Sequence, residues 1–219
     1  MKLILYSGGG ARDNRVLAKE ALSLLENPSP LIAFIPSDDQ DLEEDFADFK
    51  RKFTGQKVRF LLVPIDEPLT PRRDKQLLKA DAIFLGGGNT FYFLRNLRAR
   101  GLITKLRAFV RRGGLLMGLS AGSILMTPSI DTASVPSLDA DDNDVGVRNF
   151  SAMGLVNFEF SPHYRPDRRS DAELLRHSKK VKHPIYACAD GNGIVVKGDS
   201  LTFVGDVKVF YRGRKYNVQ

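Results

Sequence analysis

Short apolar runs alternate with helical patterns through much of this 219-residue chain. The apolar runs are rich in β-branched and aromatic residues and predict strands at 3–6, 31–35, 58–63, 82–85 and 115–119. Between several of these runs, apolar side chains recur every three or four residues, as in the helices predicted at 90–98 and 102–110. Such alternation produces a parallel sheet with helices on both faces. The sequence therefore predicts an α/β fold, a three-layer α/β/α sandwich.

The last part of the chain has a different pattern. Four short strands are predicted at 185–188, 193–196, 201–204 and 207–211, and turns containing Gly or Asp join them. We interpret them as an antiparallel C-terminal extension of a mostly parallel sheet. No linker-like stretch divides the chain, so we expect a single domain spanning residues 1–219.

The chain carries 33 Lys and Arg against 26 Asp and Glu, a formal net charge of +7. The excess is concentrated in 165–183 and 205–219, which lack interleaved aromatic residues and a nucleic-acid-binding motif. We interpret both segments as solvated faces and expect no nucleic acid partner. The N-terminal apolar run is too short for a signal peptide, and no stretch approaches the length of a membrane span. We therefore expect a cytoplasmic protein with no membrane partner.

The segment Gly118-Leu119-Ser120-Ala121-Gly122 follows an apolar strand directly and precedes a short helical run. This is a G-x-S-x-G motif in the strand-to-helix context that gives it meaning, since the serine then occupies a sharp, exposed turn. Ser120 is thus a candidate nucleophile. The N–H of Ala121, at the start of the helix, is a candidate donor to a developing oxyanion.

A second glycine cluster, Gly86-Gly87-Gly88-Asn89-Thr90, follows another predicted strand and opens a helix. Two interpretations are open. The cluster is a tight turn or weak phosphate loop, or the Gly88 N–H faces Ser120 as a second oxyanion donor. It is not a G-x-G-x-x-G dinucleotide fingerprint.

A serine nucleophile requires a base, and the chain contains three histidines. His177 falls on a helix predicted to be exposed, and His183 lies between Lys182 and Pro184, so we expect both to be solvated. His163 follows the alternating strand 156–160, which we place in the same sheet as Ser120. It is the candidate base, with a capped surface histidine as the alternative.

Three motifs in order, GGGNTF at 86–91, GLSAGS at 118–123 and SPHY at 161–164, resemble those of the peptidase E (α-aspartyl dipeptidase) family of serine peptidases. The resemblance covers nearly the whole chain. It implies a class I glutamine amidotransferase-like fold, Ser120 as nucleophile, His163 as base, and Gly88 with Ala121 as the oxyanion hole. It implies no metal and no organic cofactor, and it is compatible with a homodimer.

The family pattern places the triad acid shortly after the nucleophile helix, where this chain has Thr-Ala-Ser-Val-Pro at 132–136. The acid has moved or been replaced. The acidic stretch nearby supplies our first choice, Asp131, followed by Asp139, and Asp190 in the later segment Ala-Asp-Gly is a third option. Several positions can serve because the acid only has to orient the imidazole and stabilise its cation.

The resemblance also implies an arginine after the histidine that binds an acidic substrate side chain. Arg165, Arg168 and Arg169 are the candidates here, with Asn89 of the GGGNTF motif as a further substrate-binding residue. The alternative is a solvated helix start, in which Ser170 and Glu173 form a capping box. By contrast, carboxylates from the aspartate-rich stretch 129–147 would favour a cationic substrate if they line the site.

The sequence thus predicts a serine peptidase of the dipeptidase type that cleaves small peptides, and the resemblance suggests Asp at the substrate's N-terminus. The alternative is an amide-hydrolysing relative, or a non-catalytic module that binds a small ligand on the same scaffold.

Overall fold

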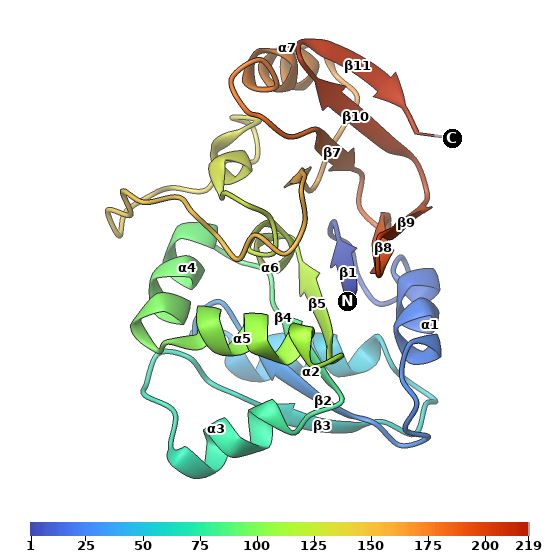
Figure 1. Ribbon diagram of the computed structural model, residues 1–219, viewed down its shortest axis with the longest axis vertical. Helices are drawn as coiled ribbons and strands as arrows, with labels where there is room; N and C mark the ends of the chain where they lie inside the picture. The colour runs from blue at the N-terminus through green and yellow to red at the C-terminus, as the bar shows by residue number, and fades with distance from the viewer. Residues whose placement is uncertain (219) are drawn as a thin grey trace.

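The computed structural model describes residues 1–218, which form two β-sheets and the helices that cover them (Figure 1). The larger sheet has seven strands in the order β3-β2-β4-β5-β1-β8-β9. The first five are parallel, whereas β8 pairs antiparallel with β1 and β9 pairs antiparallel with β8. The strands are β1 (Lys2–Tyr6), β2 (Leu31–Ile35), β3 (Arg59–Leu62), β4 (Ala82–Leu85), β5 (Leu115–Leu119), β8 (Gly193–Lys197) and β9 (Ser200–Val204).

The central strands are buried on both faces, as parallel strands between two helical layers must be. Along β1, Leu3 and Leu5 pack into one core cluster with α4 (Thr90–Ala99) and α5 (Leu102–Arg111). Ile4 and Tyr6 point the other way, into a second cluster with α1 (Arg15–Ser23) and α2 (Leu42–Arg51). The predicted three-layer α/β/α sandwich is therefore confirmed.

The helices match the apolar periodicity of the sequence, with one addition. An unpredicted helix, α3, begins at Pro71, where the Thr70 hydroxyl accepts a hydrogen bond from the Arg73 N–H as an N-cap. The helices are α1 (Arg15–Ser23), α2 (Leu42–Arg51), α3 (Pro71–Leu78), α4 (Thr90–Ala99), α5 (Leu102–Arg111), α6 (Ala121–Ile124) and α7 (Arg168–His177), with a 3₁₀ turn η1 (Asp131–Ser134). None of the helices within residues 1–218 has the length and apolar character needed to cross a bilayer.

The predicted C-terminal extension is only partly correct. Of the four predicted strands, only β8 and β9 extend the large sheet. The others join a separate four-stranded sheet in the order β11-β10-β7-β6, drawn with α7 at the top of Figure 1. Its strands are β6 (Glu159–Ser161), β7 (Ile185–Cys188), β10 (Val207–Tyr211) and β11 (Arg214–Asn217). This sheet has a small core cluster of its own, which includes Tyr164, Leu174 and Phe210. Its other apolar side chains, among them Phe160 and Val207, pack into the main core with β1 and α4.

One edge of the large sheet gathers the segments that matter below. The parallel strands β1, β4 and β5 all end there, immediately before Ser7, Gly86 and Ser120. The antiparallel strand β8 begins at the same edge, because Gly193 pairs with Tyr6. Carboxyl ends of parallel strands are the usual place for a binding site in α/β folds.

Candidate active site

Ser120 lies on a sharp turn between β5 and α6. Its backbone has a positive φ of 50°, an uncommon and strained conformation for a residue with a side chain. The flanking glycines are required by close approach, because a β-carbon on Gly118 would overlap the backbone of Gly122. A β-carbon on Gly122 would in turn overlap the carbonyl oxygen of Leu85. The G-x-S-x-G pattern thus allows β5, α6 and the end of β4 to pack closely enough to form this turn.

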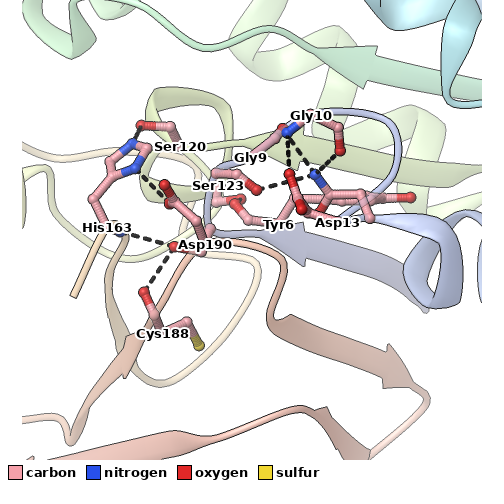
Figure 2. Close-up of polar contacts among 12 residues, drawn as sticks. Tyr6, Gly9, Gly10, Asp13, Ser120, Ser123, His163, Cys188 and Asp190 are labelled. Atoms are coloured by element: carbon pink, nitrogen blue, oxygen red, sulfur yellow. Dashed lines mark hydrogen bonds and ion pairs between the residues drawn. The ribbon is translucent and has the colours of Figure 1, made fainter. Parts of the chain in front are cut away.

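The imidazole of His163 lies between Ser120 and Asp190 (Figure 2). Its Nε2 is 2.8 Å from the Ser120 Oγ, and its Nδ1 is 2.7 Å from Oδ1 of Asp190. An ionised carboxylate only accepts hydrogen bonds, so Nδ1 donates to Asp190 and Nε2 is left to accept the serine proton. The three side chains form a continuous hydrogen-bonded series.

His163 reaches Ser120 from the smaller sheet. It follows β6, so our placement of its strand in the sheet of Ser120 is wrong. Ser7, at the end of β1, connects the two sheets: its hydroxyl accepts the His163 N–H at 2.8 Å and donates to the Cys188 carbonyl at 2.7 Å. These contacts hold His163 in a backbone conformation with a positive φ of 54°.

Gly8 lies against both the histidine and the aspartate. A β-carbon on Gly8 would overlap Oδ1 of Asp190 and ring atoms of His163. Neither Ser7 nor Gly8 was among the residues predicted for the site. The available signal was the Ser-Gly-Gly-Gly segment directly after the first strand, at the position equivalent to that of Ser120 after its own strand.

The structure places Asp190, our third option for the acid, beside His163, and it places Asp131 elsewhere. The Asp131 carboxylate accepts a 2.6 Å hydrogen bond from the Ser129 hydroxyl. Its negative charge adds to the rise that burial causes in the pKa of Glu159, and it opposes the lowering that burial causes in the pKa of His177, so Asp131 lies near both groups. The reason is topological: the four-residue connection from β7 to β8 carries Asp190 across the active edge, and local sequence does not reveal that crossing.

Two titratable groups lie near Asp131, one buried and one half-buried. Burial raises the pKa of Glu159 to about 7, and the negative charge of Asp131 adds to the effect. Our expectation that His177 is solvated is only partly correct, because its side chain is half-buried and its Nε2 has no hydrogen-bond partner in the described part of the chain. Burial lowers the pKa of His177.

A cavity of about 470 Å³ opens at Ser120. Gly88, His163, Asp139 and Asp141 contribute to its lining. Within residues 1–218, the backbone N–H groups of Gly88 and Ala121 donate to no protein acceptor, so both are free to bind a ligand oxygen. Asn89, by contrast, accepts a hydrogen bond from the Tyr92 N–H as the N-cap of α4 and does not line this cavity.

The predicted substrate arginines do not line the cavity at Ser120. Arg165 and Arg168 are exposed, and Arg169 bonds to Glu173 and the Ser137 hydroxyl. The predicted capping box is also wrong, because α7 starts three residues earlier than such a box requires. Asp167 is its N-cap and accepts hydrogen bonds from the N–H groups of Arg169 and Ser170.

Comparisons with known proteins agree on one family. The model of peptidase family S51 matches residues 3–204. A Drosophila melanogaster protein named a probable alpha-aspartyl dipeptidase is 32% identical over 148 residues, which cover 62% of this chain and 58% of that protein. Peptidase E of Streptomyces coelicolor is 33% identical over 148 residues, covering 63% of this chain and 58% of the relative. Both matches therefore span less than two thirds of the relative's own length.

A solved structure supports the fold. A candidate peptidase E protein from Listeria monocytogenes superposes with a TM-score of 0.73 at 23% identity, covering 92% of this chain and 96% of that one. At this identity the likeness concerns the fold alone. It agrees with the mostly parallel sheet and its flanking helices.

Proposed function

The chain belongs to peptidase family S51, and from this membership we propose that it is a serine peptidase that hydrolyses small peptides, with Ser120 as nucleophile. The observation that carries the proposal is the series from Ser120 Oγ through His163 to Asp190, with separations of 2.8 and 2.7 Å. A nucleophile in contact with a base that a third group orients is the arrangement of acyl-transfer enzymes.

In the proposed mechanism, the Ser120 Oγ attacks the carbonyl carbon of the scissile peptide bond while His163 Nε2 takes the serine proton. The same nitrogen then gives that proton to the leaving amine, which departs as the acyl-enzyme forms. Water attacks the acyl-enzyme with His163 again as base, and the serine is regenerated.

Asp190 has the supporting role in this scheme. It holds the imidazole in the tautomer that carries its proton on Nδ1, and it stabilises the imidazolium that forms during attack. Gly8 makes room for the pair, and Ser7 fixes the backbone of the histidine. The positive φ values of Ser120 and His163 support a functional interpretation, since such strain collects at active sites.

The N–H groups of Gly88 and Ala121 are proposed to bind the oxyanion of the tetrahedral intermediate. Ala121 follows the nucleophile directly, and Gly88 lines the same cavity as the serine. Preorganised donors of this kind contribute about 3–4 kcal/mol each to transition-state stabilisation in other serine hydrolases.

The cavity supports a small substrate. Its volume of about 470 Å³ lies within the range of small-molecule sites and suits a peptide of a few residues.

A fluorophosphonate probe tests the proposal directly. We expect stoichiometric labelling of the wild-type protein, no labelling of Ser120→Ala, and hydrolysis of a dipeptide panel that Ser120→Ala loses. Absence of both labelling and hydrolysis in the folded wild-type protein would instead favour a ligand-binding module on this scaffold.

A further inference from the structure

We infer that the cavity at Ser120 binds a cationic nitrogen of the substrate, through a subsite formed by Asp139, Asp141 and Thr132. This inference rests on the proposed function and assigns a substrate class to it. The cation is either the α-ammonium group of the substrate or a lysine or arginine side chain, and the experiment below distinguishes these sources.

The ionisable side chains that line the cavity are mostly acidic. Asp139 and Asp141 both line the cavity, and no lysine or arginine does so among the described residues. Histidine is its only other ionisable side chain, and His163 is held by Ser120 and Asp190. An acidic substrate group would therefore meet carboxylates without a compensating cation, which opposes its binding.

The two carboxylates differ in their hydrogen bonds to the rest of the protein. Asp141 accepts the Thr90 N–H at 2.8 Å through Oδ2, at the start of α4, and its own N–H donates to the Ala133 carbonyl. Asp141 is thus fixed in place, with Oδ1 left for a ligand. The Asp139 side chain is exposed and has no hydrogen-bond or ion-pair partner within residues 1–218, so its carboxylate is free to meet a cation.

Thr132 is an independent indication of a polar ligand. It lines the same cavity and is only 4% exposed, and its Oγ1 has no hydrogen-bond partner in the described part of the chain. A buried hydroxyl without a partner is costly, and a ligand N–H that reaches it would remove that cost. The two carboxylates only accept hydrogen bonds and the hydroxyl can also accept one, so the three groups together suit a donor that carries positive charge.

A neighbouring cavity strengthens the negative potential. It has a volume of about 490 Å³, shares Gly88 with the first cavity, and is lined by four aspartates together with Arg51 and Lys52. The carboxylates there are Asp38, Asp41, Asp45 and Asp48. Arg51 pairs with Asp48, and the carboxylates still outnumber the cations there. An excess of negative groups thus lies on both sides of Gly88, and such an excess attracts ligands of the opposite sign.

The first experiment compares aminoacyl p-nitroanilides of Lys, norleucine and Asp, with free and with acetylated α-amino groups. Norleucine has nearly the shape of the lysine side chain without its charge. The variants are Asp139→Asn and, as a matched control, Asp144→Asn, which changes an exposed aspartate of the same stretch that does not line the cavity. We expect kcat/KM for the cationic substrates to fall about fivefold in Asp139→Asn and to stay unchanged in Asp144→Asn.

The two sources of the cation give different patterns. If the side chain binds, Lys exceeds norleucine in the wild type and Asp139→Asn removes that preference. If the α-ammonium binds, acetylation lowers kcat/KM for all three substrates and Asp139→Asn lowers it for every free-amine substrate. The inference is overturned if Asp substrates are preferred over Lys and acetylation has no effect, or if both variants behave alike.

A binding measurement separates this inference from the proposed function. Calorimetry with Ser120→Ala compares lysine amide, norleucine amide and acetylated norleucine amide, none of which needs to be hydrolysed. Weaker binding of the neutral ligand, and loss of the difference in Ser120→Ala/Asp139→Asn, support the subsite even if the wild type proves inactive. Equal binding of all three ligands would refute the subsite even if Ser120 proves catalytic.

Discussion

Gly8 and Asp190 lie so close together that a β-carbon on Gly8 would overlap the carboxylate oxygen that bonds to His163. The contact joins the end of β1 to the connection between β7 and β8, and so joins the two sheets of the molecule. The Gly191 N–H donates to the Gly8 carbonyl in the same place, which fixes the two segments relative to each other. The position of the proposed triad acid therefore depends on a residue without a side chain.

Substitution of Gly8 tests this dependence. We expect Gly8→Ala to displace His163 or Asp190 and to lower kcat by about 10²-fold, because small misplacements at a reacting centre have effects of this size. Gly10→Ala is the control, since a β-carbon there would meet only Asp13 Oδ2 at an ordinary 3.7 Å. Dipeptide hydrolysis and circular dichroism check the two variants, and equal activity in both would contradict the expectation.

The identity of the acid is tested by two matched substitutions. Asp190→Asn should lower kcat by about 10²- to 10⁴-fold, because the imidazole loses the partner that sets its tautomer. Asp131→Asn should change kcat by less than about threefold, because its carboxylate bonds to Ser129 rather than to the histidine. Steady-state kinetics on one dipeptide decide between them, and the reverse order of effects would restore Asp131 as the acid.

Ser7→Ala removes two of the hydrogen bonds that link the two sheets. The Ser7 side chain is fully buried, and its loss leaves the His163 N–H and the Cys188 carbonyl each short of one partner. We expect a loss of about 1–3 kcal/mol in the free energy of unfolding, measured by urea denaturation, together with a lower kcat. Ser23→Ala, which removes an exposed hydroxyl that bonds within α1, should cost less than about 0.5 kcal/mol. Similar losses in the two variants would show that the Ser7 contacts contribute little.

Protonation of Glu159 should make the free energy of unfolding depend on pH. Its pKa rises from 4.5 in the unfolded chain to about 7 in the folded protein, so the folded state binds the extra proton. The wild-type protein should therefore lose stability as the pH rises from about 4.5 to 7, by up to about 3 kcal/mol. Glu159→Gln removes this dependence, whereas Glu67→Gln, at an exposed position, should keep it. Urea denaturation from pH 4.5 to 7.5 checks this, and parallel pH profiles for wild type and Glu159→Gln would refute it.

The local parts of the site could be predicted because they depend on neighbouring residues. The strands at 82–85 and 115–119 have the predicted bounds, since continuous apolar runs bounded by turn residues have few other uses in a chain of this length. The turn at Ser120 was readable because Gly118 and Gly122 permit close backbone contacts within one short segment. These features required no knowledge of distant contacts.

The tertiary structure decided which strands pair and which distant residues lie beside the predicted ones. Strand signals do not specify which strands pair, so β6, β7 and β10 were assigned to the wrong sheet. Asp190 is 27 residues from His163 in the sequence, and only the crossing from β7 to β8 brings the two together, whereas Asp131, which lies closer to Ser120 in the sequence, turns toward Ser129. The arginines after His163 remain outside the cavity because Arg165 is exposed ahead of α7, and the first turn of α7 leaves Arg168 exposed and places Arg169 beside Glu173. Sequence thus determined the fold class and the pair Ser120 and His163, because these follow from periodicity, turn chemistry and family motifs. Tertiary structure decided which acid reaches the histidine and which charges line the cavity, because both depend on how separate segments pack.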